Sequence, residues 1–164
     1  MVTLRRLNNK DKEALATLAN NKKIWDNLRD YIPHPYGEKD ALEFIKRTRQ
    51  ENPPQNFAIE YKNQFCGVIG VLLQEGIYRK TAEIGYWIGE PFWGQGIATK
   101  AVRLATAYGF RELKLVRIHA SIFEYNAGSM RVLEKNGYEK EGVFKKAIIK
   151  NDKIWDAHRY FRLA

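Results

Sequence analysis

The sequence of 164 residues predicts a single α/β (α+β) domain over residues 1–164, with a mixed, mostly antiparallel sheet of about seven strands and flanking helices. Seven segments have the alternation or the β-branched and aromatic composition of strands, and segments with apolar residues three or four positions apart lie between them. With 45% hydrophobic residues, a chain of this length buries about two-thirds of its unfolded surface in one domain. A second domain is not needed.

Strand and helix patterns alternate along the N-terminal half. A first strand is predicted over residues 2–7, and Asn8, Asn9 and Asp11 offer caps for a helix that ends near Leu18. The later helices and strands of this half are predicted at residues 22–31, 39–50, 56–61, 64–74 and 82–88.

The C-terminal half begins with a long helix and closes with a hairpin. Its helices are predicted over about 97–113 and 127–135, the second capped by Asn126 and stopped at Asn136-Gly137. Its strands are predicted at residues 117–123, 138–150 and 153–163, with the last two joined at Asn151-Asp152. His119 falls inside the first of these strands and is interpreted as a packed or solvated strand residue rather than a catalytic one.

The loop Trp93-Gly94-Gln95-Gly96-Ile97-Ala98 lies where the chain leaves a strand and enters the long helix. Small residues let successive backbone N–H groups face outward at a helix N-terminus, which favours phosphate. A P-loop is excluded because Lys100 follows Thr99 inside the helix, and a dinucleotide fingerprint fails because the next strand comes late. A glycine turn without a ligand is the alternative.

Charge and cysteine content limit the function classes. The formal net charge is +9, but the 28 basic residues are dispersed among 19 acidic ones, which indicates a solvated basic surface rather than specific nucleic-acid binding. The single cysteine, Cys66, lies in a strand pattern and is predicted to be a small buried residue. The longest apolar run, residues 67–73, is too short to cross a membrane, so a cytoplasmic protein with no membrane partner is expected, and no metal site is predicted.

Two motifs resemble the GNAT N-acetyltransferase family. The loop at Trp93 resembles the acetyl-CoA pyrophosphate motif [QR]-x-x-G-x-[GA], and its tryptophan matches the W-G-x-G-x-A-[TS] form of the RimJ/RimL-like branch. The stretch from Asn126 to Tyr138 resembles N-x-x-S-x-x-[VL]-[LM]-[EQ]-K-x-G-[FY]. Both motifs in this order and spacing are specific, and the strand order extends the resemblance over essentially the full chain.

The resemblance implies acetyl-CoA as cosubstrate, a cleft where the fourth and fifth strands splay apart, and a pantetheine arm that pairs like a strand near Trp87 and Ile88. Glu83 shares a strand face with Trp87 and is predicted to be the base, directly or through water, with an ordinary ion pair as the alternative. Ser129 is predicted to donate a hydrogen bond to the leaving thiolate, with satisfaction of local backbone groups as the alternative. The residues expected to bind the cosubstrate are Trp87, Ile88, Trp93, Gly94, Gln95, Gly96, Ile97, Ala98, Thr99, Asn126, Ser129 and Lys135.

The sequence gives less information about the amine acceptor than about the cosubstrate. An aromatic and proline-rich loop between the second and third helices is expected to form its side of the cleft, although aromatic residues at helical spacing are more often core. The residues predicted to bind the acceptor, a protein N-terminal α-amine or a small amine, are Trp25, Leu28, Tyr31, His34, Tyr36 and Glu83.

Other hypotheses are a non-catalytic acyl-CoA-binding module on the same fold and a basic nucleic-acid-associated protein. Unchanged turnover after Glu83→Gln and Ser129→Ala would favour the first, and steeply salt-dependent binding of generic DNA or RNA the second. A homodimer is compatible with the sequence.

Overall fold

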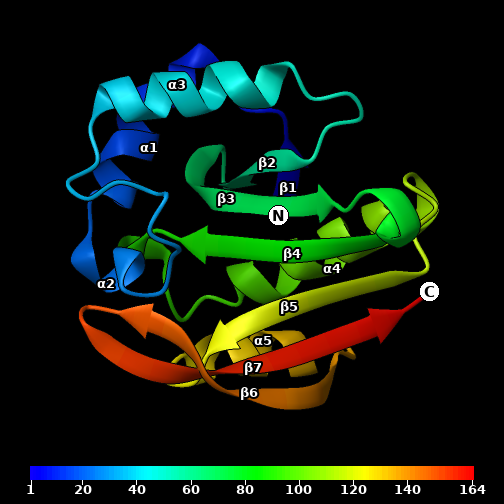
Figure 1. Ribbon diagram of the computed structural model, residues 1–164. Helices are drawn as coiled ribbons and strands as arrows, with labels where there is room; N and C mark the ends of the chain where they lie inside the picture. Colours follow the sequence, from blue (N-terminus) through cyan, green and yellow to red (C-terminus); the bar gives the residue numbers. More distant parts are fainter.

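In the computed structural model, which describes residues 1–164, one seven-stranded sheet runs through the molecule (Figure 1). The strands lie in the order β1-β2-β3-β4-β5-β7-β6, and every neighbouring pair is antiparallel except β4 and β5. The strands are β1 (Val2–Arg5), β2 (Asn56–Tyr61), β3 (Gln64–Leu73), β4 (Thr81–Ile88), β5 (Arg117–Phe123), β6 (Glu139–Lys150) and β7 (Lys153–Leu163).

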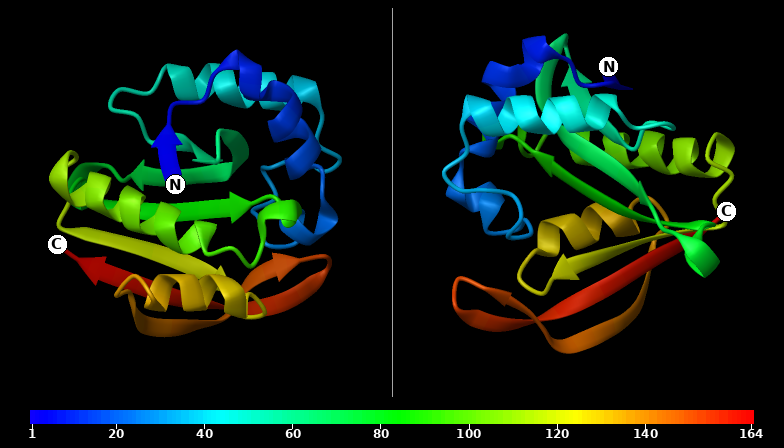
Figure 2. Two further views of the ribbon diagram at one scale, coloured as in Figure 1. Left: turned by 180° about the vertical axis from the view of Figure 1, so that it is seen from behind. Right: turned by 45° about the horizontal axis from the view of Figure 1, so that its top comes forward.

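Helices cover both faces of the sheet, as the two further views show (Figure 2). The α-helices are α1 (Lys12–Ala19), α2 (Lys22–Trp25), α3 (Glu38–Arg49), α4 (Ile97–Arg111) and α5 (Ala127–Glu134). Three short 3-10 helices are η1 (Asn9–Asp11), η2 (Gly76–Tyr78) and η3 (Glu90–Phe92). No helix is both long and apolar enough to span a membrane.

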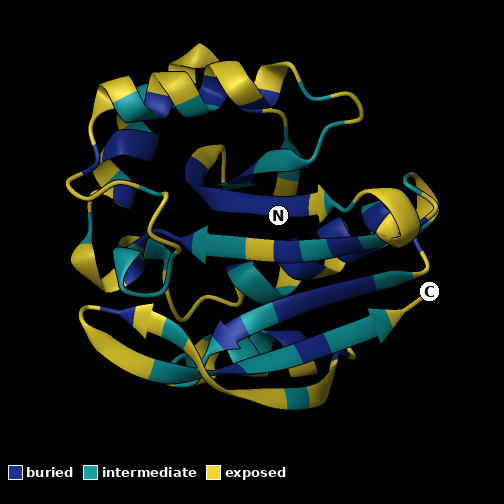
Figure 3. Ribbon diagram, in the orientation of Figure 1, coloured by how far each residue is buried: buried dark blue, intermediate teal, exposed yellow.

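The sheet separates two hydrophobic cores. The larger core joins the buried face of α4, including Val102 and Ala105, to strand residues such as Ile69 and Ile84. The smaller core joins α1 and α3 to the opposite face of β2 and β3. Because β3 contributes to both cores, it is buried along most of its length (Figure 3).

The fourth and fifth strands diverge inside the sheet. Their parallel ladder contains only Thr81, Ala82 and Glu83 of β4, although β4 continues to Ile88. The sequence-based expectation of a splay between these strands is therefore confirmed. Beyond Glu83 the edge of β4 that faces β5 has no neighbouring strand.

The sequence predicts a turn at Lys62-Asn63 as well as the one at Asn151-Asp152, and both turns are present. Lys62 and Asn63 have φ values of 52° and 60°, and Asn151 and Asp152 have φ values of 52° and 58°. Positive φ at both central residues matches the right-handed twist of the strands that such a turn connects. These turns fix the registers of the β2–β3 and β6–β7 hairpins.

One predicted helix is much shorter than expected. The pattern over residues 22–31 predicts a helix of that length, but α2 ends at Trp25. Distant side chains take the carbonyl groups that a longer helix would use, since Tyr125 donates to the carbonyl of Asp26 and Lys150 donates to that of Leu28. Tertiary contacts therefore convert residues 26–33 into a loop.

Candidate active site

The loop before α4 contains a run of backbone amides without a hydrogen-bond partner. Gly94 and Gly96 have φ values of 74° and 70°, a conformation that favours glycine, and a Cβ at either position would contact nothing. The first backbone hydrogen bond into α4 comes from the amide of Lys100, and the amides of Gly94 through Thr99 donate to no group in the chain. Six consecutive N–H groups thus remain free at the positive end of a 15-residue helix.

Three side-chain hydrogen bonds hold this loop in place. The indole Nε1 of Trp93 donates to the carbonyl of Ile88 at 2.7 Å, and Nε2 of Gln95 donates to the carbonyl of Pro91 at 3.3 Å. From the end of α5, Asn136 donates to the carbonyl of Thr99 at 3.1 Å. Lys135, the residue before it, is exposed and lies at the same helix end. The amides are therefore presented by a fixed backbone.

The open edge of β4 begins beside that loop. Strands β3 and β4 are antiparallel, and the amide of Gly89 and the carbonyl of Thr81 form hydrogen bonds with the β3 side. The backbone N–H and C=O groups of odd-numbered β4 residues therefore point toward β3, and those of even-numbered residues point away from it. Tyr86 and Ile88 consequently turn their backbone groups toward the gap at β5, and Trp93 already occupies the Ile88 carbonyl. Trp87 faces β3 with its backbone, and its ring packs 6.5 Å from that of Phe65.

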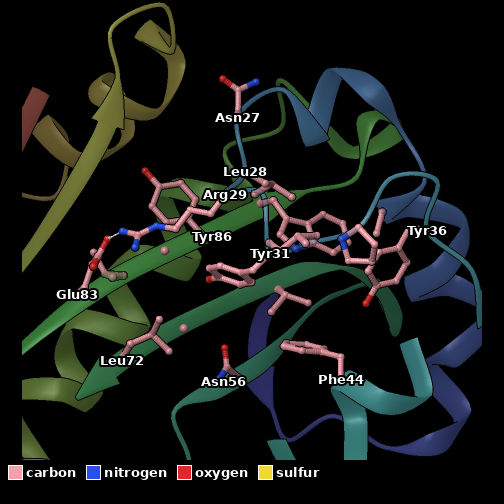
Figure 4. Close-up of a pocket in the computed structure, with 18 of the residues that line it drawn as sticks. Asn27, Leu28, Arg29, Tyr31, Tyr36, Phe44, Asn56, Leu72, Glu83 and Tyr86 are labelled. Atoms are coloured by element: carbon pink, nitrogen blue, oxygen red, sulfur yellow. Dashed lines mark hydrogen bonds and ion pairs between the residues drawn. The ribbon is translucent and has the colours of Figure 1, made fainter. Parts of the chain in front are cut away.

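A cleft of about 630 Å³ extends from this gap across to the α1 and α3 side (Figure 4). Fourteen of its 27 lining residues are hydrophobic. The lining as a whole comes from β2, β3, β4 and β5, from α1, α3 and α5, and from the loop after α2. The cleft contains Glu83, Asn126 and Ser129 together with the predicted acceptor residues Leu28, Tyr31 and Tyr36.

Glu83 lies on the cleft wall and forms an ion pair with Arg29. The Glu83 side chain is 22% exposed and that of Arg29 is 54% exposed. In the short parallel ladder Glu83 is paired with His119, so it lies where β4 and β5 begin to separate. The ordinary ion pair that the sequence left open is therefore present.

Two hydroxyl groups meet on the opposite wall. The Oγ of Ser129 and the Oη of Tyr86 lie 2.8 Å apart, and the Tyr86 hydroxyl also lies 3.1 Å from the Ser129 carbonyl. Asn126 caps α5, because its side-chain oxygen accepts from the Ser129 amide at 3.2 Å. Burial raises the pKa of the Tyr86 phenol far above its ordinary value, so this hydroxyl keeps its proton at neutral pH.

Two predicted acceptor residues lie outside the cleft lining. Trp25 and His34 stack on each other with ring centroids 5.5 Å apart, and Trp25 donates to the carbonyl of Ile32 at 2.9 Å. The Lys150 ammonium lies 3.4 Å from the centroid of the Trp25 ring. Trp25 and His34 therefore support the loop after α2, which we call the acceptor loop for its predicted role, instead of lining the cleft.

Lys150 joins the C-terminal hairpin to that loop. Its side chain is only 2% exposed, and its Nζ donates to the Leu28 carbonyl and to the Asp30 carboxylate, both at 2.9 Å. The neighbouring Asn151 donates to the Asp26 carboxylate at 2.9 Å. These contacts fix the loop on both sides of Arg29.

Comparison with known proteins identifies the family. The model of the acetyltransferase (GNAT) domain matches residues 1–139, which is more than half of the chain. This chain belongs to the GNAT acetyltransferase family. Its splayed fourth and fifth strands and its glycine loop before α4 are thus parts of an acetyltransferase fold.

Curated relatives of this acetyltransferase include two proteins of Bacillus subtilis. The protein named "Uncharacterized N-acetyltransferase YnaD" is 31% identical over 82% of this chain and 79% of its own length. The protein named "Probable N-acetyltransferase YjcK" is 49% identical over 80 residues, which are 49% of this chain and 44% of that protein. The match to YjcK therefore covers less than half of either sequence.

Among solved structures, the GNAT fold of this chain is similar to that of RimL, a ribosomal L7/L12 α-N-protein acetyltransferase in complex with coenzyme A. The identity is 26%, the TM-score is 0.85, and the alignment covers 99% of this chain and 93% of RimL. The RimJ/RimL-like resemblance read from the two motifs is thus confirmed.

The sequence did not point to three residues that line or support the candidate site. Tyr86 gave no signal beyond its place in the central strand, although its alternation with Glu83 and Trp87 indicates that it faces the α4 and α5 side. Arg29 and Lys150 gave no signal in the sequence, because a charged residue outside any motif is usually exposed to solvent. Their partners lie 54 and 120 residues away in the chain.

Proposed function

We propose that this chain transfers the acetyl group of acetyl-CoA to a primary amine, either the α-amine of a protein N-terminus or that of a small molecule, by direct attack in a ternary complex. The observation that carries the proposal is the run of free amides from Gly94 to Thr99, next to the open edge of β4. Diphosphate suits this arrangement, because it accepts several N–H bonds and carries the charge that a helix N-terminus favours.

The donor is held along one continuous path. The amides of residues 94–99 bind the diphosphate, and Lys135 adds a positive charge from the end of α5. The pantetheine arm lies in the gap between β4 and β5 and pairs with backbone groups of Tyr86 and Ile88, the two residues that face this gap. Asn126 completes the path at the start of α5. The path leads the thioester toward Ser129 and Glu83.

The acyl transfer uses groups on both walls of the cleft. Bound acetyl-CoA supplies an activated acyl carbon and a thiolate leaving group. Glu83 takes a proton from the acceptor ammonium, directly or through water, so that the neutral amine can attack. The Ser129 hydroxyl, supported by the Tyr86 hydroxyl 2.8 Å away, donates a hydrogen bond to the departing sulfur. The amine attacks the thioester directly, so the mechanism has no covalent enzyme intermediate. The single cysteine, Cys66, is buried in the core and is not available as a nucleophile.

Burial also argues against Cys66 as a nucleophile, because it raises the pKa of the thiol to about 11. Tyr125, a weaker candidate for the acid, donates its hydroxyl to the carbonyl of Asp26 and packs on Trp155 with centroids 4.9 Å apart. These contacts tie Tyr125 to the acceptor loop. Ser129 therefore remains the proposed donor to the thiolate.

The proposal is tested by calorimetry with acetyl-CoA and by thiol release over a panel of amines and N-terminal peptides. We expect acetyl-CoA to bind and Glu83→Gln to lower kcat by roughly 10²- to 10⁴-fold, the range of general base catalysis, with little change in acetyl-CoA affinity. The matched control is Glu75→Gln, which removes an exposed carboxylate outside the cleft. Absence of acetyl-CoA binding to the wild-type chain would refute the proposed function.

A further inference from the structure

Two opposite charges meet on the wall of the acceptor cleft. Arg29 and Glu83 both line it, and a single Nη2 group of Arg29 contacts Oε1 of Glu83 (Figure 4). The Nε and Nη1 groups of Arg29 donate to no group in the chain, and the side chain is about half exposed. A planar guanidinium with free N–H groups is suited to a carboxylate, which it binds through two parallel hydrogen bonds.

The backbone around Arg29 is fixed, whereas its side chain is held at one point. Lys150 binds the carbonyl of Leu28 and the carboxylate of Asp30, the residues before and after Arg29. Arg29 can therefore exchange its partner without movement of the loop. The other charged residues of the cleft, Asp40, Glu43 and Arg47, are on α3 and do not pair with Arg29 or Glu83.

We propose that the acceptor carries a carboxylate close to its reactive primary amine. This inference rests on the proposed function and names the acceptor class of the same site. On binding, the acceptor ammonium replaces Arg29 at Glu83, and the acceptor carboxylate takes the guanidinium of Arg29. One ion pair within the protein is exchanged for two between the protein and the acceptor.

Other acceptors leave a charge without a partner. A monoamine without a carboxylate takes Glu83 as its ammonium and leaves the half-exposed guanidinium of Arg29 with water as its only partner, so one ion pair is exchanged for one and none is gained. A polyamine adds repulsion, because a second ammonium then lies near the guanidinium. An acceptor with both an ammonium and a carboxylate satisfies both side chains.

The carboxylate has two chemical sources, and paired acceptors distinguish them. Free α-amino acids are compared with their α-amides, and peptides that begin with Asp or Glu are compared with peptides that begin with Asn or Gln. The two members of each pair have nearly the same shape, and one of them carries an additional negative charge. We expect at least one carboxylate class to exceed its amide partner in kcat/KM by roughly 10- to 100-fold, the range for a hydrogen bond between charged groups.

Arg29→Gln supplies the second measurement. We expect this variant to remove the preference by lowering kcat/KM for the carboxylate acceptors roughly tenfold or more, with less than about threefold change for their amides. Acetyl-CoA affinity serves as the folding readout and stays unchanged. The matched control is Arg49→Gln, which removes an exposed arginine of α3 that does not line the cleft.

Several outcomes would overturn the inference while the proposed function survives. Equal use of acids and amides would do so, and so would an equal loss on all acceptors in Arg29→Gln. Binding of acetyl-CoA with thiol release only from polyamines or neutral amines would also reject it. If acetyl-CoA does not bind at all, the proposed function itself fails, and the two failures are thus distinguishable.

Discussion

The donor and acceptor sides of the cleft are built in different ways. On the proposed donor side, the candidate binding groups are backbone amides of one short segment, Gly94 to Thr99, shaped by two glycines with positive φ. On the acceptor side, side chains from distant segments meet: Arg29 with Glu83, and Lys150 with Asp30. A local motif can therefore specify the donor, whereas the acceptor depends on how the C-terminal hairpin fixes the loop at residues 26–33.

Among the changes that compare these two sides, the largest effect is expected on the donor side. Gly96→Val places a β-branched residue at φ 70°, where a non-glycine residue costs about 1–2 kcal/mol or more, so the loop rearranges and its amides no longer converge. We expect acetyl-CoA affinity to fall roughly tenfold or more by calorimetry. Gly142→Val is the control, because a Cβ there also meets nothing but φ is not positive. Equal affinity in both variants would contradict a role for these amides.

A somewhat smaller effect is expected when the acceptor loop is released. Lys150→Met keeps the length of a side chain that is 2% exposed but removes its bonds to Leu28 and Asp30, a loss of about 1–3 kcal/mol in unfolding free energy. The KM for the amine should rise more than the KM for acetyl-CoA. Lys153→Met, an exposed change on the same hairpin, should alter neither constant. A parallel rise of both constants would show that Lys150 stabilises the whole fold and not the acceptor loop.

The sequence predicts much of the fold because its signals are local. The strand pattern at residues 56–61 and 117–123 and the turns at 62–63 and 151–152 depend on neighbouring residues alone, and the structure has them where they are expected. The helix predicted over 22–31 fails for the opposite reason. Its apolar spacing is helical, but Lys150 and Tyr125 bind its carbonyl groups from the far end of the chain.

The same distinction applies to the site. Glycines and an N-cap at Asn126 mark a place where backbone groups are available, so the donor loop can be recognised in the sequence. No spacing rule links Arg29 to Glu83, since ion pairs across a fold have no fixed separation. The prediction that Trp25 and His34 line the cleft was wrong for the same reason. The sequence does not distinguish an aromatic residue that lines a cavity from one that supports a loop.

A third prediction concerns the hydroxyl pair where the two sides meet. Ser129→Ala removes the proposed donor to the thiolate, and Tyr86→Phe removes the hydroxyl that supports it. Sulfur is a weak acceptor even as the charge develops on it, so we expect this bond to contribute about 0.5–1.5 kcal/mol. The kcat should then fall about 2- to 12-fold for Ser129→Ala, and less for Tyr86→Phe. Acetyl-CoA binding should persist in both. If Ser129→Ala retains full kcat while Tyr86→Phe does not, Tyr86 itself donates to the sulfur.

The smallest expected effect is a pH dependence at the junction of the two sides. His119 pairs with Glu83 in the ladder and is 5% exposed, and burial, together with Arg159, lowers its pKa from the ordinary 6.5. The unfolded chain therefore binds more protons than the native one just below pH 6.5, so the contribution to stability is full above that pH and is lost as pH falls toward the native pKa.

The loss of stability caused by His119 occurs at a different pH from the loss caused by the carboxylates. Hydrogen bonds and neighbouring charges lower the pKa of Asp26, Glu90 and Asp156 from values near 4, so their contributions disappear only in more acidic solution. We expect urea midpoints to decline between pH 7 and pH 5 in the wild type and to decline less in His119→Gln. An identical slope in the variant would mean that a group other than His119 titrates between pH 7 and pH 5.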